Sequence, residues 1–152
     1  MSALTGLDVV SQISEILSTS FPKEITTVYI NTPMQDMEKP CFFIQQITTS
    51  NDKQLRKTAN RRYFMDIRVH PAENNDTIRT WLYDIGDRLF TVLNYITISG
   101  QRVYGRNMRF EITDNVLHFF VDYSFRVTQL EDEGIKMRTL ETDEYINYYG
   151  KL

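Results

Sequence analysis

The sequence predicts one α+β domain in which two main helices pack on a mostly antiparallel sheet. Two segments carry apolar residues at helical spacing, and several others alternate apolar and polar residues as strands do. The expected order is helix, strand, hairpin, helix, hairpin and tail, or α-β-β-β-α-β-β followed by a C-terminal extension. The 152 residues suit a single core, since 41% of them are hydrophobic. We therefore expect residues 1–130 to form the domain and residues 131–152 an acidic, tyrosine-containing extension.

The first helix is predicted to run from Leu7 to Phe21. Its apolar residues recur three or four positions apart and form one buried stripe. They are Val9, Val10, Ile13, Ile16, Leu17 and Phe21. Thr5 and Asp8 have the spacing of a capping box before the helix, and Pro22 stops it.

Three strands are expected next. Residues 25–31 are rich in β-branched residues, and residues 41–49 carry bulky residues on both faces. Residues 60–70 alternate strictly, with Tyr63, Met65, Ile67 and Val69 on one face and a mainly polar face turned outward or toward a partner. The segment between the last two strands, residues 50–59, is predicted to be a long polar hairpin loop.

The second helix is predicted over residues 78–96, where apolar residues keep helical spacing for more than five turns. Asn74, Asn75 and Asp76 supply its N-cap. Gly86 interrupts it, which costs about 1 kcal/mol relative to alanine unless a close packing contact uses the missing side chain. We expect this helix to lie across the sheet.

The last two strands are predicted to form a hairpin. Met108, Phe110 and Ile112 alternate up to a tight turn at residues 113–115, where Asp and Asn tolerate positive φ. Residues 116–130 then alternate over an unusual length. At about 3.3 Å per residue, such a strand can reach beyond the body of the domain.

Catalytic and metal-binding motifs are absent from the sequence. The single cysteine, Cys41, excludes an internal disulfide and lies in an apolar run. The two histidines, His70 and His118, have no His or Cys at ligand spacing and are expected to be half-exposed strand residues. No phosphate-binding glycine loop or G-x-S-x-G motif occurs. We expect no enzyme activity, no cofactor and no metal, and neither a signal peptide nor a membrane span.

The charged surface segments are the candidate sites. Residues 51–62 are basic, with Lys53, Arg56, Lys57, Arg61 and Arg62 against one acid, Asp52. Residues 131–152 carry six acids against three bases. Opposite charges on one chain suit head-to-tail contact between copies, although two solvated surfaces explain them equally well. The candidate interface also includes the turn and tail residues Asp114, Asn115, Glu131, Asp132, Glu133, Tyr145, Tyr148 and Tyr149.

The order of elements and several short segments resemble the tail terminator, or tail completion, proteins of long-tailed phages and prophages of Gram-positive bacteria. The resemblance covers roughly residues 5–130. It rests on the helix opening at residues 7–13 that leads to Phe21-Pro22, on residues 27–31, on Gln35-Asp36, on residues 39–44, and on residues 62–71 with the helix after them.

The resemblance implies a structural virion protein that forms a hexameric ring. Such a ring caps the head-proximal end of the tail tube, stops tube polymerisation and provides the surface that joins the head. It implies as partners other copies of the chain, the tail tube protein, the head–tail connector or stopper, and the sheath where the tail is contractile. DNA would only pass through, no membrane is involved, and assembly takes place in the host cytoplasm.

Other interpretations stay open at this stage. Within the same class, the alternative is another head–tail connector or neck protein, such as a head-closure ring, or a tail tube protein, since these proteins differ in the ring on which they stack. From a different class, a small nucleic-acid-binding module would use the basic residues 53–62, although no aromatic residue interleaves them for base stacking. An enzyme would require a pocket around His118 with a strongly perturbed carboxylate.

Overall fold

The computed structural model describes residues 5–25, 27–31, 38–72 and 77–128. In these residues the chain forms two helices and six strands, and the α+β class is confirmed. The elements follow the predicted order with one addition, the short strand β4. They are α1 (Gly6–Ser20), β1 (Thr27–Ile30), β2 (Cys41–Lys53), β3 (Thr58–His70), α2 (Ile78–Val92), β4 (Tyr95–Ile98), β5 (Gln101–Thr113) and β6 (Val116–Thr128).

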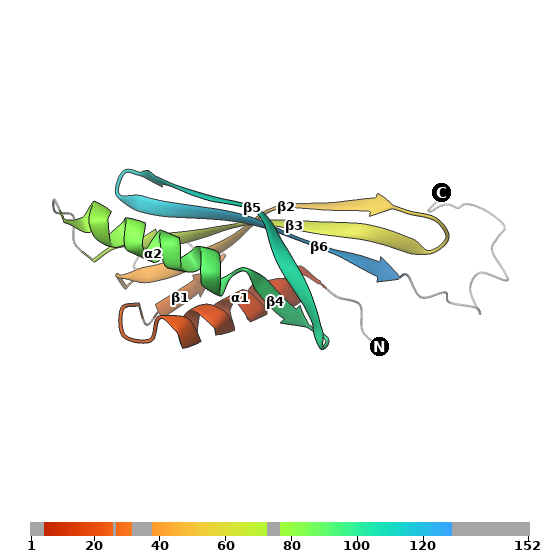
Figure 1. Ribbon diagram of the computed structural model, residues 1–152, viewed down its shortest axis with the longest axis horizontal. Coiled ribbons are helices and arrows are strands. Elements are labelled where there is room, and N and C mark those ends of the chain that lie inside the picture. Colours follow the sequence, from red (N-terminus) through yellow and green to blue (C-terminus); the bar gives the residue numbers. More distant parts are fainter. Residues whose placement is uncertain (1–4, 26, 32–37, 73–76, 129–152) are drawn as a thin grey trace.

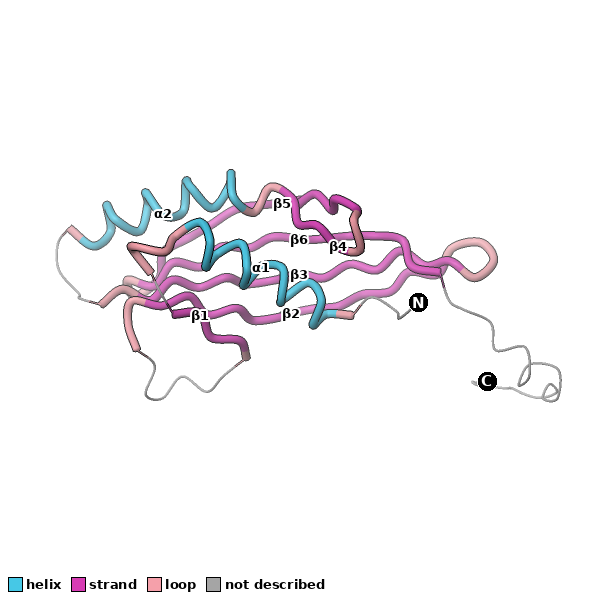
Figure 2. Tube along the Cα trace, turned by 90° about the horizontal axis from the view of Figure 1, so that it is seen from below, coloured by secondary structure: helices cyan, strands magenta, loops and turns pink. Residues whose placement is uncertain are grey.

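The strands form one sheet in the order β1-β2-β3-β6-β5-β4. All neighbouring pairs are antiparallel except β1 and β2, which run parallel. Both helices cover the same face of this sheet, and the opposite face carries no helix (Figures 1 and 2). The described part of the chain is therefore a two-layer structure with an open sheet face.

The core lies between the helices and the covered face. The alternation predicted for β3 is confirmed, because Tyr63, Met65, Ile67 and Val69 are buried beneath the helices. The same register buries every second residue of β6, from Leu117 to Tyr123. At roughly 25 cal/mol per Å² of apolar surface removed from water, this interface supplies most of the stabilisation.

The first helix forms as predicted. The backbone N–H of Thr5 donates to the Asp8 carboxylate at 2.8 Å, as a capping box requires. Val9, Ile13 and Leu17 point into the core.

The second helix is shorter than predicted, because it ends at Val92 and Ile96 lies in β4. Ile96 keeps helical spacing from Leu93, but it pairs with Val103 in a β-ladder. Apolar residues three positions apart near the end of a helix can therefore belong to the next strand, and helical spacing alone predicted a helix that is too long. At Gly86 a close packing contact does use the missing side chain, since a Cβ there would lie 2.7 Å from the Phe110 ring. The predicted N-cap residues 74–76 lie outside the described residues.

The predicted loop at residues 50–59 is mostly strand, which corrects the sequence analysis. Ladder pairs continue from Ser50 with Arg62 to Lys53 with Ala59, so only residues 54–57 form the turn. The backbone N–H of Gln54 donates to the carbonyl of Thr58 at 2.9 Å. These strand ends lack a core-facing apolar side, and a strand without one shows no period in its sequence.

The β5–β6 turn is as tight as predicted. Asp114 and Asn115 both have positive φ, 52° and 59°. Two central residues in this conformation match the hairpin turn whose twist suits antiparallel strands.

Candidate assembly surfaces

Strands β2, β3 and β6 extend well past both helices, where they form a projecting arm (Figures 1 and 2). We define the arm as residues 50–62 and 124–128. The change in environment is clear along β2, whose first four residues are buried and whose last seven are exposed. The long strand predicted near residues 116–130 therefore does reach beyond the body, together with the β2–β3 hairpin.

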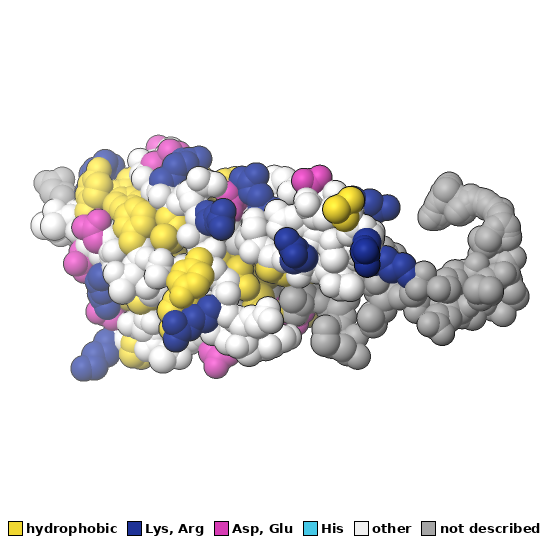
Figure 3. All heavy atoms as spheres, turned by 45° about the vertical axis from the view of Figure 1, so that its right-hand side comes forward, with side chains coloured by type: hydrophobic (Ala, Val, Ile, Leu, Met, Phe, Trp, Pro, Cys, Tyr) yellow, Lys and Arg dark blue, Asp and Glu magenta, His cyan; other side chains and the backbone are white. Residues whose placement is uncertain are grey.

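All five predicted basic residues lie on this arm, and Arg126 of β6 adds a sixth. Basic side chains gather at the arm end of the molecule in Figure 3. Among them, Arg61 Nε donates to Asn51 Oδ1 at 3.0 Å, and Arg62 pairs with Asp122. Asp52 is the one acid within the arm, so the arm is strongly positive.

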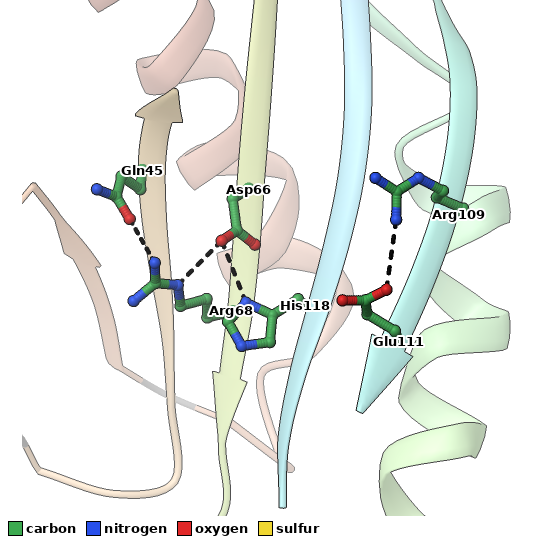
Figure 4. Close-up of polar contacts among 6 residues, drawn as sticks. All are labelled: Gln45, Asp66, Arg68, Arg109, Glu111 and His118. Carbon is green, nitrogen blue, oxygen red and sulfur yellow. Dashed lines mark hydrogen bonds and ion pairs between the residues drawn. The ribbon is translucent and has the colours of Figure 1, made fainter. Parts of the chain in front are cut away.

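The open sheet face carries a network of buried and half-buried polar residues, centred on Asp66 (Figure 4). The Asp66 carboxylate accepts from Arg68 Nε at 3.0 Å and lies 3.2 Å from Nδ1 of His118. Arg68 Nη2 donates to Gln45 Oε1 at 2.6 Å. The network joins β2, β3 and β6, and it holds the Arg68 guanidinium in one orientation over the Phe43 ring.

A second carboxylate, Asp122, occupies the same face nearer the arm. It accepts from Arg62 Nη2 at 2.7 Å and from Asn107 Nδ2 at 2.9 Å. Its Oδ1 atom, like that of Asp66, is buried without a hydrogen-bond partner. The hydrogen bond to Asp122 raises the pKa of Arg62 above its ordinary value. The polar face of β3 lies on the open side of the sheet, and Asp66 is buried on it.

Aromatic rings separate these charged residues. Phe120 stacks on Phe64 with centroids 5.7 Å apart, and on His118 at 6.2 Å. The Arg109 guanidinium lies 4.3 Å from the Phe120 centroid and also contacts Glu111 at 3.5 Å. Stacked rings and oriented guanidiniums make a firm, flat surface that suits contact with another macromolecule.

His118 and Asp66 form the kind of pair that can orient a general base, and the polar side chains that the structure links to this pair are Arg68 and Gln45. Cys41 pairs with His70 across the ladder, yet burial raises the pKa of its thiol and disfavours the reactive thiolate. In the same residues no group of three or more His, Cys, Asp or Glu side chains is arranged to hold a metal ion. No described helix combines the length and apolar character needed to cross a membrane.

The structure separates the predicted site residues into groups. Lys53, Arg56, Lys57, Arg61 and Arg62 come together on the arm, and Asp114 and Asn115 lie at the opposite end of the sheet, level with α2 (Figure 1). The tail candidates Glu131, Asp132, Glu133, Tyr145, Tyr148 and Tyr149 lie outside the described residues.

The sequence analysis did not single out the carboxylates of the open face. Asp66 and Asp122 lie at polar positions of two strands with alternating sequences. These positions indicate a shared polar surface only once the two strands, β3 and β6, are known to be neighbours. His70 is also corrected: it is buried rather than half-exposed, and its Nε2 atom has no hydrogen-bond partner.

Comparison with known proteins supplies the family. A family model described as phage tail terminator protein matches residues 8–135, from the first turn of α1 to beyond β6. No curated protein matches the chain. One solved chain of 8% sequence identity aligns at a TM-score of 0.40 over 84% of this chain and 98% of that chain. On the extent of the family match, the chain belongs to the phage tail terminator protein family.

Proposed function

We propose that the chain assembles into a hexameric ring that caps the head-proximal end of the phage tail tube. The ring stops tube polymerisation and provides the surface to which the head is joined. Membership of the family makes the chain a structural component of the tail, without catalytic turnover. The ring, its position and its six copies are the further steps of this proposal, and they follow the resemblance described above.

The projecting arm is the observation that carries the proposal. A closed ring requires a heterologous interface, in which one patch of a subunit meets a different patch of the next. The arm is basic and stands clear of the helices (Figure 1). The open face holds the buried carboxylates of Asp66 and Asp122 and the stacked rings of Phe64 and Phe120. Two unlike surfaces on one subunit supply the asymmetry that a ring needs.

The proposed partners are other copies of the chain, the tail tube protein and the head–tail connector or stopper. A sheath protein joins them if the tail is contractile. The net charge of −3 is consistent with DNA that passes through the ring without being held tightly. No cofactor takes part.

Mass measurement in solution combined with negative-stain imaging tests the proposal. We expect six-membered rings, either free or formed when tail tubes are added, and we expect them at one end of each tube. Tubes grown in the presence of the protein should stop lengthening. A protein that stays monomeric and leaves tube length unchanged would contradict the proposal.

Charge reversal on the arm tests whether it is an interface. Arg56→Glu with Lys57→Glu should weaken ring formation by roughly 10-fold while leaving the unfolding midpoint nearly unchanged, because exposed charges contribute little to folding. Lys23→Glu and Arg79→Glu, made at exposed positions outside the arm, are matched controls for the change in net charge.

DNA binding by the arm is measured on the same variants. The nucleic-acid alternative requires affinity that falls steeply with salt concentration near physiological values and is lost on arm reversal. A native chain without salt-dependent DNA affinity, or a DNA affinity that survives arm reversal, would eliminate that alternative.

A further inference from the structure

The outer edge of β2 is open along the arm. Strand β1 pairs only with residues 41–44, so residues 45–53 have β3 on one side and, within the described part of the chain, no strand on the other. Unpaired N–H and C=O groups along such an edge are a template for another strand. No proline interrupts the edge, and Ile47 at its irregularity is 45% exposed.

The chain itself contains a segment whose chemistry fits this edge. Residues 131–152 carry six acids against three bases, opposite in sign to the arm with its six bases and one acid. The segment has no proline, and residues 145–149 are Tyr-Ile-Asn-Tyr-Tyr, which favour strand structure. The family match ends at residue 135, so most of this segment lies outside it.

The position of β6 favours docking on another copy. Strand β6 ends at Thr128, which pairs with Thr58 at the arm tip, so the chain leaves the fold in the direction that the arm points. Strand β3 lies between β6 and the β2 edge, which places that edge about 10 Å to the side at the usual strand spacing. A segment from its own chain must reverse and cross β3, whereas one from a second copy can approach directly.

We propose that residues 131–149 of one copy add as a strand to the β2 edge, residues 45–53, of a neighbouring copy, where the acidic residues meet the basic arm. Main-chain hydrogen bonds supply affinity, and the charges select the register. The inference rests on the proposed function for the presence of a neighbour. It gives the ring a link between adjacent subunits that does not depend on core packing.

Disulfide trapping tests the docking directly. Ser50→Cys on the exposed β2 edge and Tyr148→Cys are made in separate full-length chains, which are mixed, assembled on tail tubes and oxidised. The native Cys41 is buried and serves as an internal negative control. We expect a disulfide-linked pair that contains one of each variant, and a ladder of linked multimers when both cysteines are in one chain.

Two results would overturn the inference. The first is a double-cysteine chain that closes on itself as a monomer, which places the segment on its own arm. The second is rings that appear in images but give no cross-link. Since imaging scores the rings independently, absence of rings counts against the proposed function, and rings without cross-links count against the docking alone.

A charge exchange tests the electrostatic part. Lys53→Glu with Arg56→Glu should weaken association by roughly 10-fold, as the loss of a few exposed ion pairs implies. Converting Glu131, Asp132 and Glu133 to lysine in the same chain should restore it. If the lysine conversions restore nothing and the arm variants instead lose affinity for DNA, the arm binds nucleic acid and the docking is disproved.

Discussion

Strands β2, β3 and β6 each run through two different environments, the helix-covered body and the projecting arm. Each strand has 13 residues, and their ladders continue from one environment into the other, with one shift of the β2–β3 register at Ile47. In the body the inward side chains are fully buried, as Phe42 and Phe119 are. In the arm every residue of β2 is exposed, and the side chains of β2 there are polar or charged.

The comparison distinguishes the residues that stabilise the fold from the residues that form the exposed surface of the arm. Apolar burial in the body supplies the stabilisation, and the hydrogen-bonded ladder extends the arm from it with little burial of its own. The basic side chains of the arm are therefore not required by the core. Ordering the backbone of the arm costs conformational entropy, and the arm buries little apolar surface in return. A segment of this kind typically gains its stabilisation in an assembly.

The largest expected effect comes from truncating matched apolar residues in the two regions. Phe119 is buried and packs against the ring of Phe90, with centroids 5.2 Å apart. Phe119→Ala should lower the free energy of unfolding by about 3–5 kcal/mol. Leu55 at the arm tip is 85% exposed, and Leu55→Ala should change it by less than about 0.5 kcal/mol. Denaturant unfolding measures both, and similar losses would remove the distinction between body and arm.

A smaller effect is expected at Asp122, where the two regions meet. Asp122→Ala removes the acceptor shared by Arg62 and Asn107, and it should cost about 1–3 kcal/mol of unfolding free energy. Asp122→Asn keeps the shape and one acceptor oxygen, so it should cost less. Chemical denaturation compares the two variants. Equal stability of Asp122→Ala and the native chain would show that this network serves contact and not folding.

The body was predictable from the sequence and the arm largely was not. The apolar periods of α1 and β3 depend on a buried face, which is why Val9, Ile13 and Met65 were assigned correctly. The ladder from Ser50 to Lys53 has no buried face, and it was taken for a loop. At the end of α2, helical spacing concealed β4, because Ile96 satisfies both patterns.

The contacts of the open face depend on which strands are neighbours. Asp66 and His118 are 52 positions apart, and they meet only because β3 pairs with β6. No local sequence pattern indicates that β3 and β6 pair. The basic residues of the arm were found because charge is visible in composition, whereas Asp66 and Asp122 became candidates only through the sheet order.

The smallest expected effect is a pH dependence at His70, which is buried at the body end of β3, far from the arm. Burial is the largest cause that lowers the pKa of His70, and the charges of Lys39, Arg68 and His118 act in the same direction against Asp66. The unfolded chain therefore binds a proton at this residue below about pH 6.5 while the folded chain does not. Folding stability should fall as the pH drops through 6.5 toward the lowered pKa.

In His70→Gln this part of the decline should disappear, which unfolding free energies measured between pH 7.5 and 5 would show. His118→Gln, which removes the other histidine of the chain, is the matched control and should keep most of the His70 contribution, because burial is its largest cause. An unchanged slope in His70→Gln would mean that water reaches His70 in the folded chain, and the body would then be less tightly closed at that end than its burial indicates.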